Sequence, residues 1–182
     1  MRNSSVGDAA IAVVRRNTEE VQGKGNWGLF EELFADDFVD HTPQPGTTPD
    51  KDGVRVLYKR LRAAFPDFHP EIHWQAAAGN LVTTYKTYHG THQGEFLGIP
   101  ATGKKVSFYT VDAMRVVDGK ITEHWGVATL LDLMQQLGVV PPLGRQRWRH
   151  RSPNGSPGRP LLAQFNEISR RERMSPYKER EQ

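Results

Sequence analysis

The sequence predicts an α+β fold in which N-terminal helices pack on a curved, mostly antiparallel sheet. Three segments with apolar side chains at helical spacing precede Pro66. After Pro66, four segments alternate apolar and polar side chains and are rich in Val, Thr, Tyr and Ile, which favours strands. Helices that precede consecutive strands are typical of the α+β class, and 182 residues suffice for one such domain with a core.

The helices are predicted from spacing and from residues that begin or end helices. Residues 8–22 place apolar side chains on one face with charged side chains between them. Asn26 can cap a second helix, in which aromatic and leucine side chains recur every three or four residues. Asp50 or Asp52 begins a third helix, and Pro66 closes it.

The strands follow from alternation and from turn residues between them. A short strand is predicted at 38–41, and the longer strands at 68–77, 80–92, 104–117 and 120–128. Gly79-Asn80 and Asp118-Gly119 are hairpin turn signals, because the hairpin turn types need residues that tolerate positive φ. Helical spacing resumes over 130–137 and ends at Gly138.

Composition limits the function classes. No apolar run approaches the roughly 18 residues of a membrane-spanning helix, and no secretory signal is visible, so we expect a cytoplasmic protein. The chain has no cysteine, which excludes disulfides and thiolate chemistry. Residues 1–138 hold 14 Lys/Arg against 17 Asp/Glu, a balance of −3, which does not favour nucleic-acid binding by this domain.

Residues 139–182 differ from the rest of the chain. They hold 10 Lys/Arg against 4 Asp/Glu, a balance of +6, and they are rich in Pro, Gly and Arg. We therefore expect two regions, a folded domain over 1–138 and a basic extension over 139–182 that is largely disordered. The arginines of the extension could contact phosphate, including that of a nucleic acid, an anionic membrane or an acidic partner, although a solvated extension without a role is the simpler interpretation.

Several short motifs, spread over most of the domain, resemble one protein family. They are Phe38 to His41, Phe65-Pro66-Asp67, Gly90 to Lys104, Asp112, Asp118 to Ile121, Glu123-His124-Trp125 and Gln135 to Gly138. With this order of elements, residues 8–138 resemble the SnoaL-like polyketide cyclases, or ester cyclases, of the nuclear transport factor 2-like superfamily. The resemblance implies a cone-shaped α+β barrel around one buried pocket.

The resemblance also implies a chemistry. The best-understood members of the family close a polyketide ring by intramolecular aldol condensation without metal or organic cofactor. One aspartate is implicated as the acid/base, with neighbouring His, Gln or Asn groups holding the enolate oxygen. In this chain Gly126 and Thr129 stand at the two positions where that aspartate is expected.

Asp112 and His124 are the candidate catalytic residues. Alternation places Asp112 on the same strand face as Phe108, Thr110 and Met114, and a carboxylate on an apolar face is costly to bury without partners. A structural aspartate that bonds a neighbouring strand or His124 is the alternative. Glu123 and His124 point to opposite faces, and we expect His124 to face the pocket, although a histidine that clamps two strands is the simpler interpretation.

Other side chains are candidates for substrate binding. His41 stands at the end of a strand before a Pro-rich loop, where a cavity rim is expected. Tyr85 and His89 share one face of the long strand, and we expect that face to be concave and Lys86 to look outward. Solvent contact for His41 and cross-strand packing for Tyr85 are the alternatives.

Two further expectations concern apolar side chains. Phe96 lies in a glycine-rich loop that suits either a lid over a hydrophobic ligand or a dimer contact, and Phe108 shares the strand face of Asp112. Trp125 is expected to pack in the core against the N-terminal helix. No pair of histidines has the spacing of metal ligands on a helix, so no metal site is predicted.

Three functions are compatible with these observations. The first is a cofactor-independent cyclase or isomerase acting on a hydrophobic carbonyl compound. The second is a binding protein that holds a small lipophilic molecule without changing it, which the residues at 126 and 129 favour. The third is an interaction protein that dimerises through its open sheet face, and we expect a homodimer because such a face is costly to hydrate.

Overall fold

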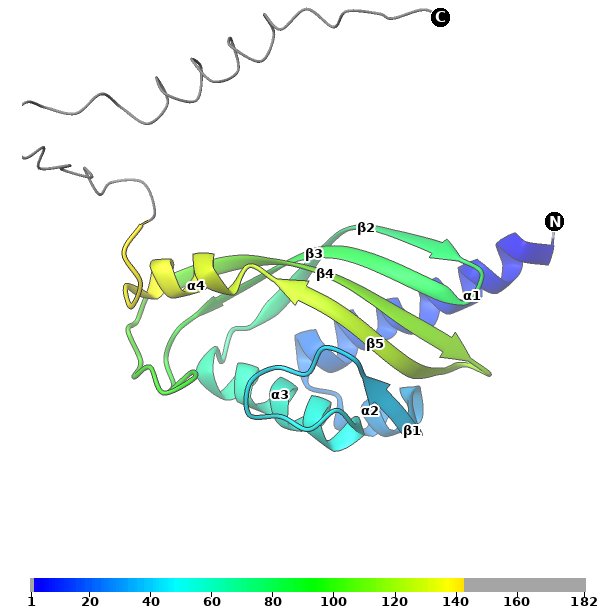
Figure 1. The fold of residues 1–182 in the computed structure, drawn as a ribbon, viewed down its shortest axis with the longest axis horizontal. Helices are drawn as coiled ribbons and strands as arrows, with labels where there is room; N and C mark the ends of the chain where they lie inside the picture. Colours follow the sequence, from blue (N-terminus) through cyan, green and yellow to red (C-terminus); the bar gives the residue numbers. More distant parts are fainter. Residues whose placement is uncertain (1, 143–182) are drawn as a thin grey trace, which may run out of the picture. The chain divides into compact units, whose positions relative to one another are not determined.

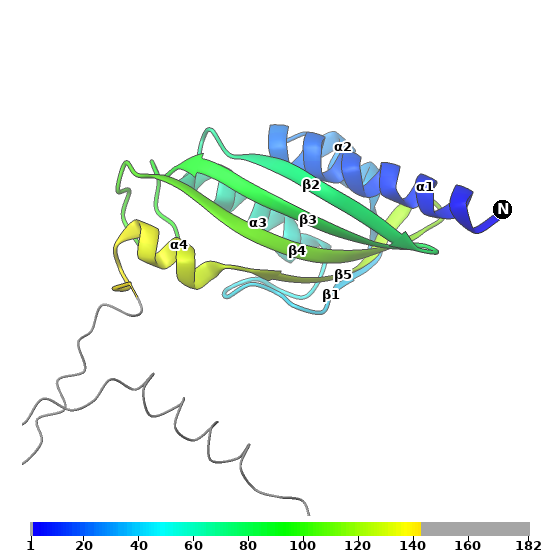
Figure 2. The same ribbon diagram turned by 90° about the horizontal axis from the view of Figure 1, so that it is seen from above.

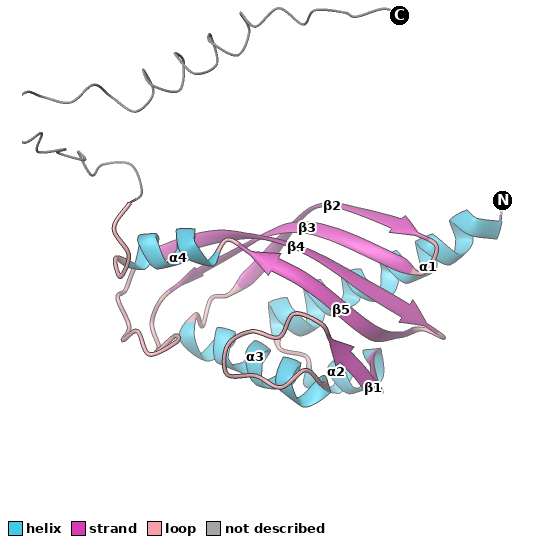
Figure 3. Ribbon diagram, viewed as in Figure 1, coloured by secondary structure: helices cyan, strands magenta, loops and turns pink. Residues whose placement is uncertain are grey.

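The structure is a computed structural model that describes residues 2–142, and it confirms the predicted α+β fold. Helices α1, α2 and α3 lie on one face of a five-stranded sheet (Figures 1 and 2). Within the described residues, Figure 3 shows no helix over the middle of the opposite face. Most of the predicted extension, from residue 143 onward, lies outside the described residues, as do the arginines considered for phosphate contact.

The sheet is open and mixed, with the strand order β1-β5-β4-β3-β2. Neighbouring strands run antiparallel except β1 and β5, which are parallel. Both predicted hairpin turns are present: Gly79 has φ +63°, and Asp118 and Gly119 have φ +48° and +77°. The strands are β1 (Phe34–Asp40), β2 (His69–Ala78), β3 (Leu81–Thr91), β4 (Lys105–Val117) and β5 (Lys120–Ala128).

The helices begin and end at residues whose side chains or backbone favour it. Asn26 Oδ1 accepts a hydrogen bond from Leu29 N, and Asp50 Oδ1 accepts one from Gly53 N, so both predicted caps are made. Gly138 ends the helix over Leu130–Leu137 in the left-handed conformation, with φ +91°. The helices are α1 (Arg2–Arg16), η1 (Asn17–Gln22), α2 (Trp27–Leu33), α3 (Lys51–Ala64) and α4 (Leu130–Leu137).

Two predicted boundaries differ from the structure. The helix predicted at 8–22 begins at residue 2, and its last six residues form the π-helical segment η1. The strand predicted at 38–41 begins at Phe34, because Phe34 pairs with Ile121 of β5 across the sheet. The spacing of apolar residues along the chain predicts neither the register with β5 nor the π-helical hydrogen bonding.

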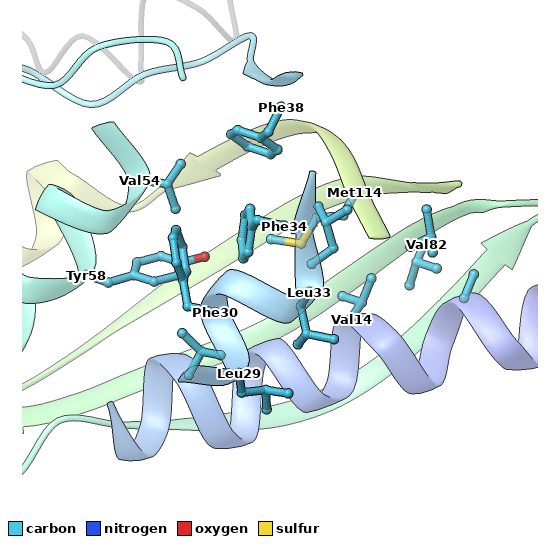
Figure 4. Packing of buried hydrophobic residues seen from close by; sticks show 14 residues of the cluster. Val14, Leu29, Phe30, Leu33, Phe34, Phe38, Val54, Tyr58, Val82 and Met114 are labelled. Atoms are coloured by element: carbon cyan, nitrogen blue, oxygen red, sulfur yellow. The ribbon is translucent and has the colours of Figure 1, made fainter. Parts of the chain in front are cut away.

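The main core lies between the helices and the inner face of the sheet. Phe30 of α2 and Phe34 of β1 stack with their ring centroids 4.5 Å apart, and Tyr58 of α3 packs against the edges of both rings (Figure 4). A second cluster joins α3, the loop after β3, the inner face of β4, and α4. Both clusters include residues of α3, and together they hold this helix over the inner face of the sheet.

The predicted core position of Trp125 is wrong. Its ring stacks on the imidazole of His41 at a centroid distance of 4.4 Å, and the Arg115 guanidinium lies over it. Alternation along β5 explains the difference, because His124 occupies the face that looks toward α3. Trp125 therefore lies on the opposite face from the one that packs on the helices.

Candidate functional site

A cavity lies between helix α3, strand β1 and the inner face of β3, β4 and β5, and Phe96 closes part of it from the loop after β3. Its volume is about 80 Å³. That is several times the roughly 10–15 Å³ that a cavity needs to hold one water molecule, so the cavity can admit part of an organic ligand. Most of its wall is aromatic and aliphatic, with a few polar side chains from β1, β4 and β5.

His124 and Asp40 form a hydrogen-bonded pair on the cavity wall. The parallel register of β1 and β5 sets Asp40 beside His124, and His124 Nδ1 lies 2.8 Å from Asp40 Oδ1. A carboxylate only accepts hydrogen bonds, so Nδ1 carries the proton and Nε2 of the neutral ring has a free lone pair. The pair therefore presents a fixed imidazole nitrogen that can take up a proton.

The surroundings of Asp40 favour its ionised form. Burial raises the pKa of this carboxyl, but the hydrogen bond from His124, the positive charge of that ring when it is protonated, and hydrogen bonds from Thr42 outweigh burial and lower it. Thr42 also accepts a hydrogen bond from the backbone N–H of Gly126. The first residues after β1 thus fix both the carboxylate and the strand that carries His124.

Asp112 and Lys86 form a second pair, which is fully inside the protein. Lys86 Nζ lies 2.6 Å from Asp112 Oδ2, and their side chains are 0% and 3% exposed. Lys86 Nζ also contacts Gln22 Oε1 at 3.3 Å and lies over the Tyr88 ring. Asp112 Oδ1, the other carboxylate oxygen, has no hydrogen-bond partner among the described residues.

The inward position of Lys86 corrects our expectation that it looks outward. Along β3 the even-numbered side chains are buried, and they include Val82, Thr84, Lys86 and Tyr88; of the odd-numbered ones only Thr87 is buried. Strand alternation therefore also turns Tyr85 and His89 to the opposite face. A lysine is rarely fully buried unless it is paired, and Asp112 supplies that pairing.

Gly126 leaves a gap between the two pairs. A Cβ at this position would lie 2.9 Å from His124 Nε2 and 3.3 Å from Asp112 Cβ. The imidazole cannot easily move away, because Asp40 holds its other nitrogen. The absence of a side chain at Gly126 therefore keeps the space between His124 and Asp112 open.

A polar network from η1 lies next to Lys86. Gln22 accepts a hydrogen bond from Tyr88 Oη at 2.9 Å and donates one to Tyr58 Oη at 2.7 Å. Burial and the neighbouring Asp112 charge raise the pKa of Tyr88, and burial and Tyr88 raise that of Tyr58. Both phenols therefore keep their protons and remain available as hydrogen-bond donors.

The structure brings together four of the seven predicted site residues. Asp112, His124, Phe96 and Phe108 all line the cavity. The other three do not line it.

Tyr85 stacks on Tyr109, and His89 contacts Glu71 at 3.2 Å, both on the uncovered face of the sheet. His41 contacts Glu123 Oε2 at 2.9 Å and stacks on Trp125, so it lies near the rim but points away from the cavity. We expected Tyr85 and His89 to face the cavity, but the even-numbered positions of β3 form its inner face. Strand alternation therefore places both residues on the outer face.

Sequence reasoning missed Asp40 and Lys86. Asp40 is two residues after Phe38 and so shares its buried face, a signal that the sequence contained. Lys86 has an even number like Val82 and Tyr88 and so lies on their face of β3, but because it is charged we expected it to face solvent. Thr129, one of the two positions where an aspartate was expected, hydrogen-bonds the backbone of Tyr109 at the start of α4 and does not line the cavity.

Two further findings bear on the function classes. In residues 2–142, no helix is long and apolar enough to cross a membrane. In the same residues, no group of three or more His, Asp or Glu side chains is arranged to hold a metal ion.

Comparison with known proteins gives consistent results. The family model described as SnoaL-like polyketide cyclase matches residues 12–137. Aklanonic acid methyl ester cyclase DnrD of Streptomyces peucetius is 40% identical over 71 residues, which are 39% of this chain and 48% of that protein. Nogalonic acid methyl ester cyclase of Streptomyces nogalater is 37% identical over 71 residues, 39% of this chain and 52% of that protein.

The match spans about half the length of these two relatives. Among solved structures, wild-type IdmH of Streptomyces antibioticus superposes with a TM-score of 0.63 and is 31% identical. That superposition covers 71% of this chain and 98% of IdmH. The likeness to IdmH therefore extends over nearly all of that protein's fold.

Proposed function

The chain belongs to the SnoaL-like polyketide cyclase family, and from this premise we propose that it catalyses the cofactor-independent intramolecular aldol cyclisation of a polyketide ester. Two relatives carry the names of cyclases that act on methyl esters, aklanonic acid methyl ester and nogalonic acid methyl ester. We therefore propose a polyketide methyl ester as the substrate.

One observation carries the proposal: a histidine on the cavity wall has one ring nitrogen held by a buried carboxylate, and the other has no hydrogen-bond partner within residues 2–142. In the proposed reaction, His124 Nε2 takes a proton from the carbon next to a carbonyl of the substrate, which leaves an enolate. The enolate carbon attacks a second carbonyl carbon of the same molecule and forms the ring bond. The new alkoxide then takes the proton from Nε2, so no proton is gained or lost overall.

The remaining side chains have supporting roles in this proposal. Asp40 orients the imidazole and stabilises its protonated form, as a positioning residue. The buried Lys86–Asp112 pair sets the electrostatic field where negative charge develops, and Asp112 contacts the substrate through its free oxygen. Phe96 and Phe108 pack against the apolar body of the substrate.

The gap at Gly126 is where the reacting carbon fits. Space there opens toward both His124 Nε2 and Asp112, so a substrate carbon in it lies next to the proposed base. Gly126 and Thr129 stand at the two positions where the family resemblance led us to expect an acid/base aspartate. In this chain we assign the acid/base role to His124 instead.

Turnover of aklanonic acid methyl ester and of nogalonic acid methyl ester tests the proposal. We expect His124→Gln to lower kcat by about 100-fold or more, because the proton acceptor is lost. His69→Gln is the matched control, since His69 is exposed, contacts the backbone of Asp67 and does not line the cavity, and we expect the rate of the parent. A parent rate for His124→Gln would contradict the proposal, as would a ligand that binds the parent protein but is never converted.

We also propose a homodimer that forms through the uncovered face of the sheet. That face exposes Trp74 at 49%, Tyr109 at 46% and Val127 at 70%. Aromatic and aliphatic side chains gathered on one sheet face are costly to hydrate, and a second copy of the same face is a self-complementary cover. Sedimentation over a range of concentrations tests this, and a monomer at the highest concentration would contradict it.

A further inference from the structure

We propose that Asp112 and Thr110 form a subsite for a hydroxyl group of the ligand, so that the protein selects compounds with an enolic or phenolic hydroxyl next to a carbonyl. The proposal deepens the proposed function and relies on it only for the class of ligand, a polyketide. The subsite itself is inferred from two side chains of β4 and their surroundings.

Both side chains are inside the protein and incompletely satisfied. Asp112 is 3% exposed and Thr110 is 8% exposed, and both line the cavity. Among the described residues, neither Asp112 Oδ1 nor Thr110 Oγ1 has a hydrogen-bond partner. Native structures leave few buried polar atoms without partners, so two of them on one cavity wall indicate where a ligand completes the structure.

The two positions face the same side because they are two residues apart on one strand. Lys86 occupies only Oδ2 of the carboxylate, and the unpartnered Oδ1 can therefore accept a further hydrogen bond. A buried carboxylate oxygen without a partner favours a ligand O–H or N–H group, which can donate a hydrogen bond to it. An ether oxygen at the same place cannot donate a hydrogen bond.

Thr110 defines the neighbouring part of the ligand. Its hydroxyl has a hydrogen to donate, and a ligand carbonyl next to the hydroxyl group can accept it. A hydroxyl and a carbonyl on two carbons that are separated by one further carbon are the arrangement of an enolised 1,3-dicarbonyl compound or of a phenol with a ketone on the adjacent ring position. Polyketide chains carry oxygen on alternate carbons and so provide this pair.

Gly126 makes the subsite reachable. The Cβ that Gly126 lacks would lie 3.3 Å from Asp112 Cβ, so a ligand atom can approach this carboxylate from the side of His124. The subsite and the proposed base therefore face one space. A hydroxyl held by Asp112 would fix which carbon of the ligand lies next to His124.

Equilibrium binding of simple probes tests the subsite without turnover. We would measure, by calorimetry, the dissociation constants of 2-naphthol and its methyl ether 2-methoxynaphthalene. We expect the parent protein to bind 2-naphthol about tenfold tighter or more, the effect of one hydrogen bond to a charged group. Equal affinities for the two probes, or no measurable binding of 2-naphthol, would overturn the proposal.

Variants separate the subsite from the rest of the cavity. Asp112→Leu combined with Lys86→Met removes the pair without leaving a lone buried charge, and we expect it to bring the ratio of the two dissociation constants close to one. The second variant, Thr110→Val, keeps the shape of the side chain and removes its hydroxyl. We expect it to weaken the binding of 2-acetyl-1-naphthol, a probe that also has a carbonyl, by less than the double variant does. Thr83→Val on the adjacent strand, outside the cavity lining, is the matched control with the ratio of the parent.

The proposed function and the subsite can fail separately. His124→Gln removes the proposed base and leaves Asp112 and Thr110 in place, so we expect it to keep the preference for 2-naphthol while losing turnover. A double variant that retains the parent's preference overturns the subsite even if His124→Gln is inactive.

Discussion

Replacement of Lys86 by methionine tests the buried ion pair that underlies the site. The methionine side chain has a similar length, so the change removes the ammonium and leaves Asp112 in the interior with no cation beside it. In the parent protein, Lys86 Nζ lies 2.6 Å from Asp112 Oδ2 and 3.3 Å from Gln22 Oε1, and it also lies over the Tyr88 ring. Burial is nearly complete for both partners of the ion pair, so water cannot replace the ammonium without entering the core.

The expected loss of stability is about 3–5 kcal/mol, the usual effect of removing one partner of a buried pair. For a domain of this size, about 3–4 °C of melting temperature per kcal/mol gives a fall of roughly 10–20 °C. The double variant with Asp112→Leu removes both charges, and we expect it to recover to within about 1 kcal/mol of the parent.

Urea unfolding followed by tryptophan fluorescence measures these differences. We expect a lower midpoint for Lys86→Met with an unchanged slope, because the surface exposed on unfolding stays the same. Lys105→Met is the control, since Lys105 is exposed, and its effect should stay within about 0.5 kcal/mol. A single variant as stable as the parent, or a double variant no more stable than the single one, would refute the reasoning.

The remaining predictions concern the other pair and the gap. Gly126→Ala places a Cβ 2.9 Å from His124 Nε2, and we expect a folded protein whose kcat/KM falls about tenfold or more; an unchanged kcat/KM would show that the gap is not used. Because the pKa of Asp40 is lowered in the folded state from its ordinary 3.8, ionised Asp40 stabilises the fold above about pH 4, and this contribution is lost as the pH falls through the folded pKa. The stability difference between the parent and Asp40→Asn should therefore shrink as the pH is lowered from about 5 to about 2.5 in thermal unfolding. A difference that stays constant or grows in acid would contradict this assignment.

Features set by local chemistry were predictable from the sequence. Asn26 and Asp50 cap helices through bonds to residues three positions away, and Gly138 ends α4 by its own backbone conformation. The two hairpins follow equally from their turn residues. Asp112 was placed correctly on an inward face because alternation along β4 has no interruption before it.

Features set by distant pairing were not predictable. The Asp40–His124 pair joins residues 84 positions apart, and only the parallel register of β1 and β5 brings them together. Strand alternation gives two possible faces but does not say which is buried, so Tyr85 and Lys86 exchanged places relative to our prediction. The burial of Lys86 depends on a carboxylate of the adjacent strand, which no local pattern reveals.

The central claim, that His124 takes the proton from the substrate, is tested most directly by following that proton. Aklanonic acid methyl ester deuterated at the carbon that forms the new bond should lose this deuterium as the ring closes, because His124 passes it to the new hydroxyl group, which exchanges with water. Mass spectrometry of the product can follow this loss over a single turnover. We expect His124→Gln to slow this loss about 100-fold or more and His69→Gln to leave it unchanged. Loss at the parent rate with His124→Gln would show that another group removes the proton.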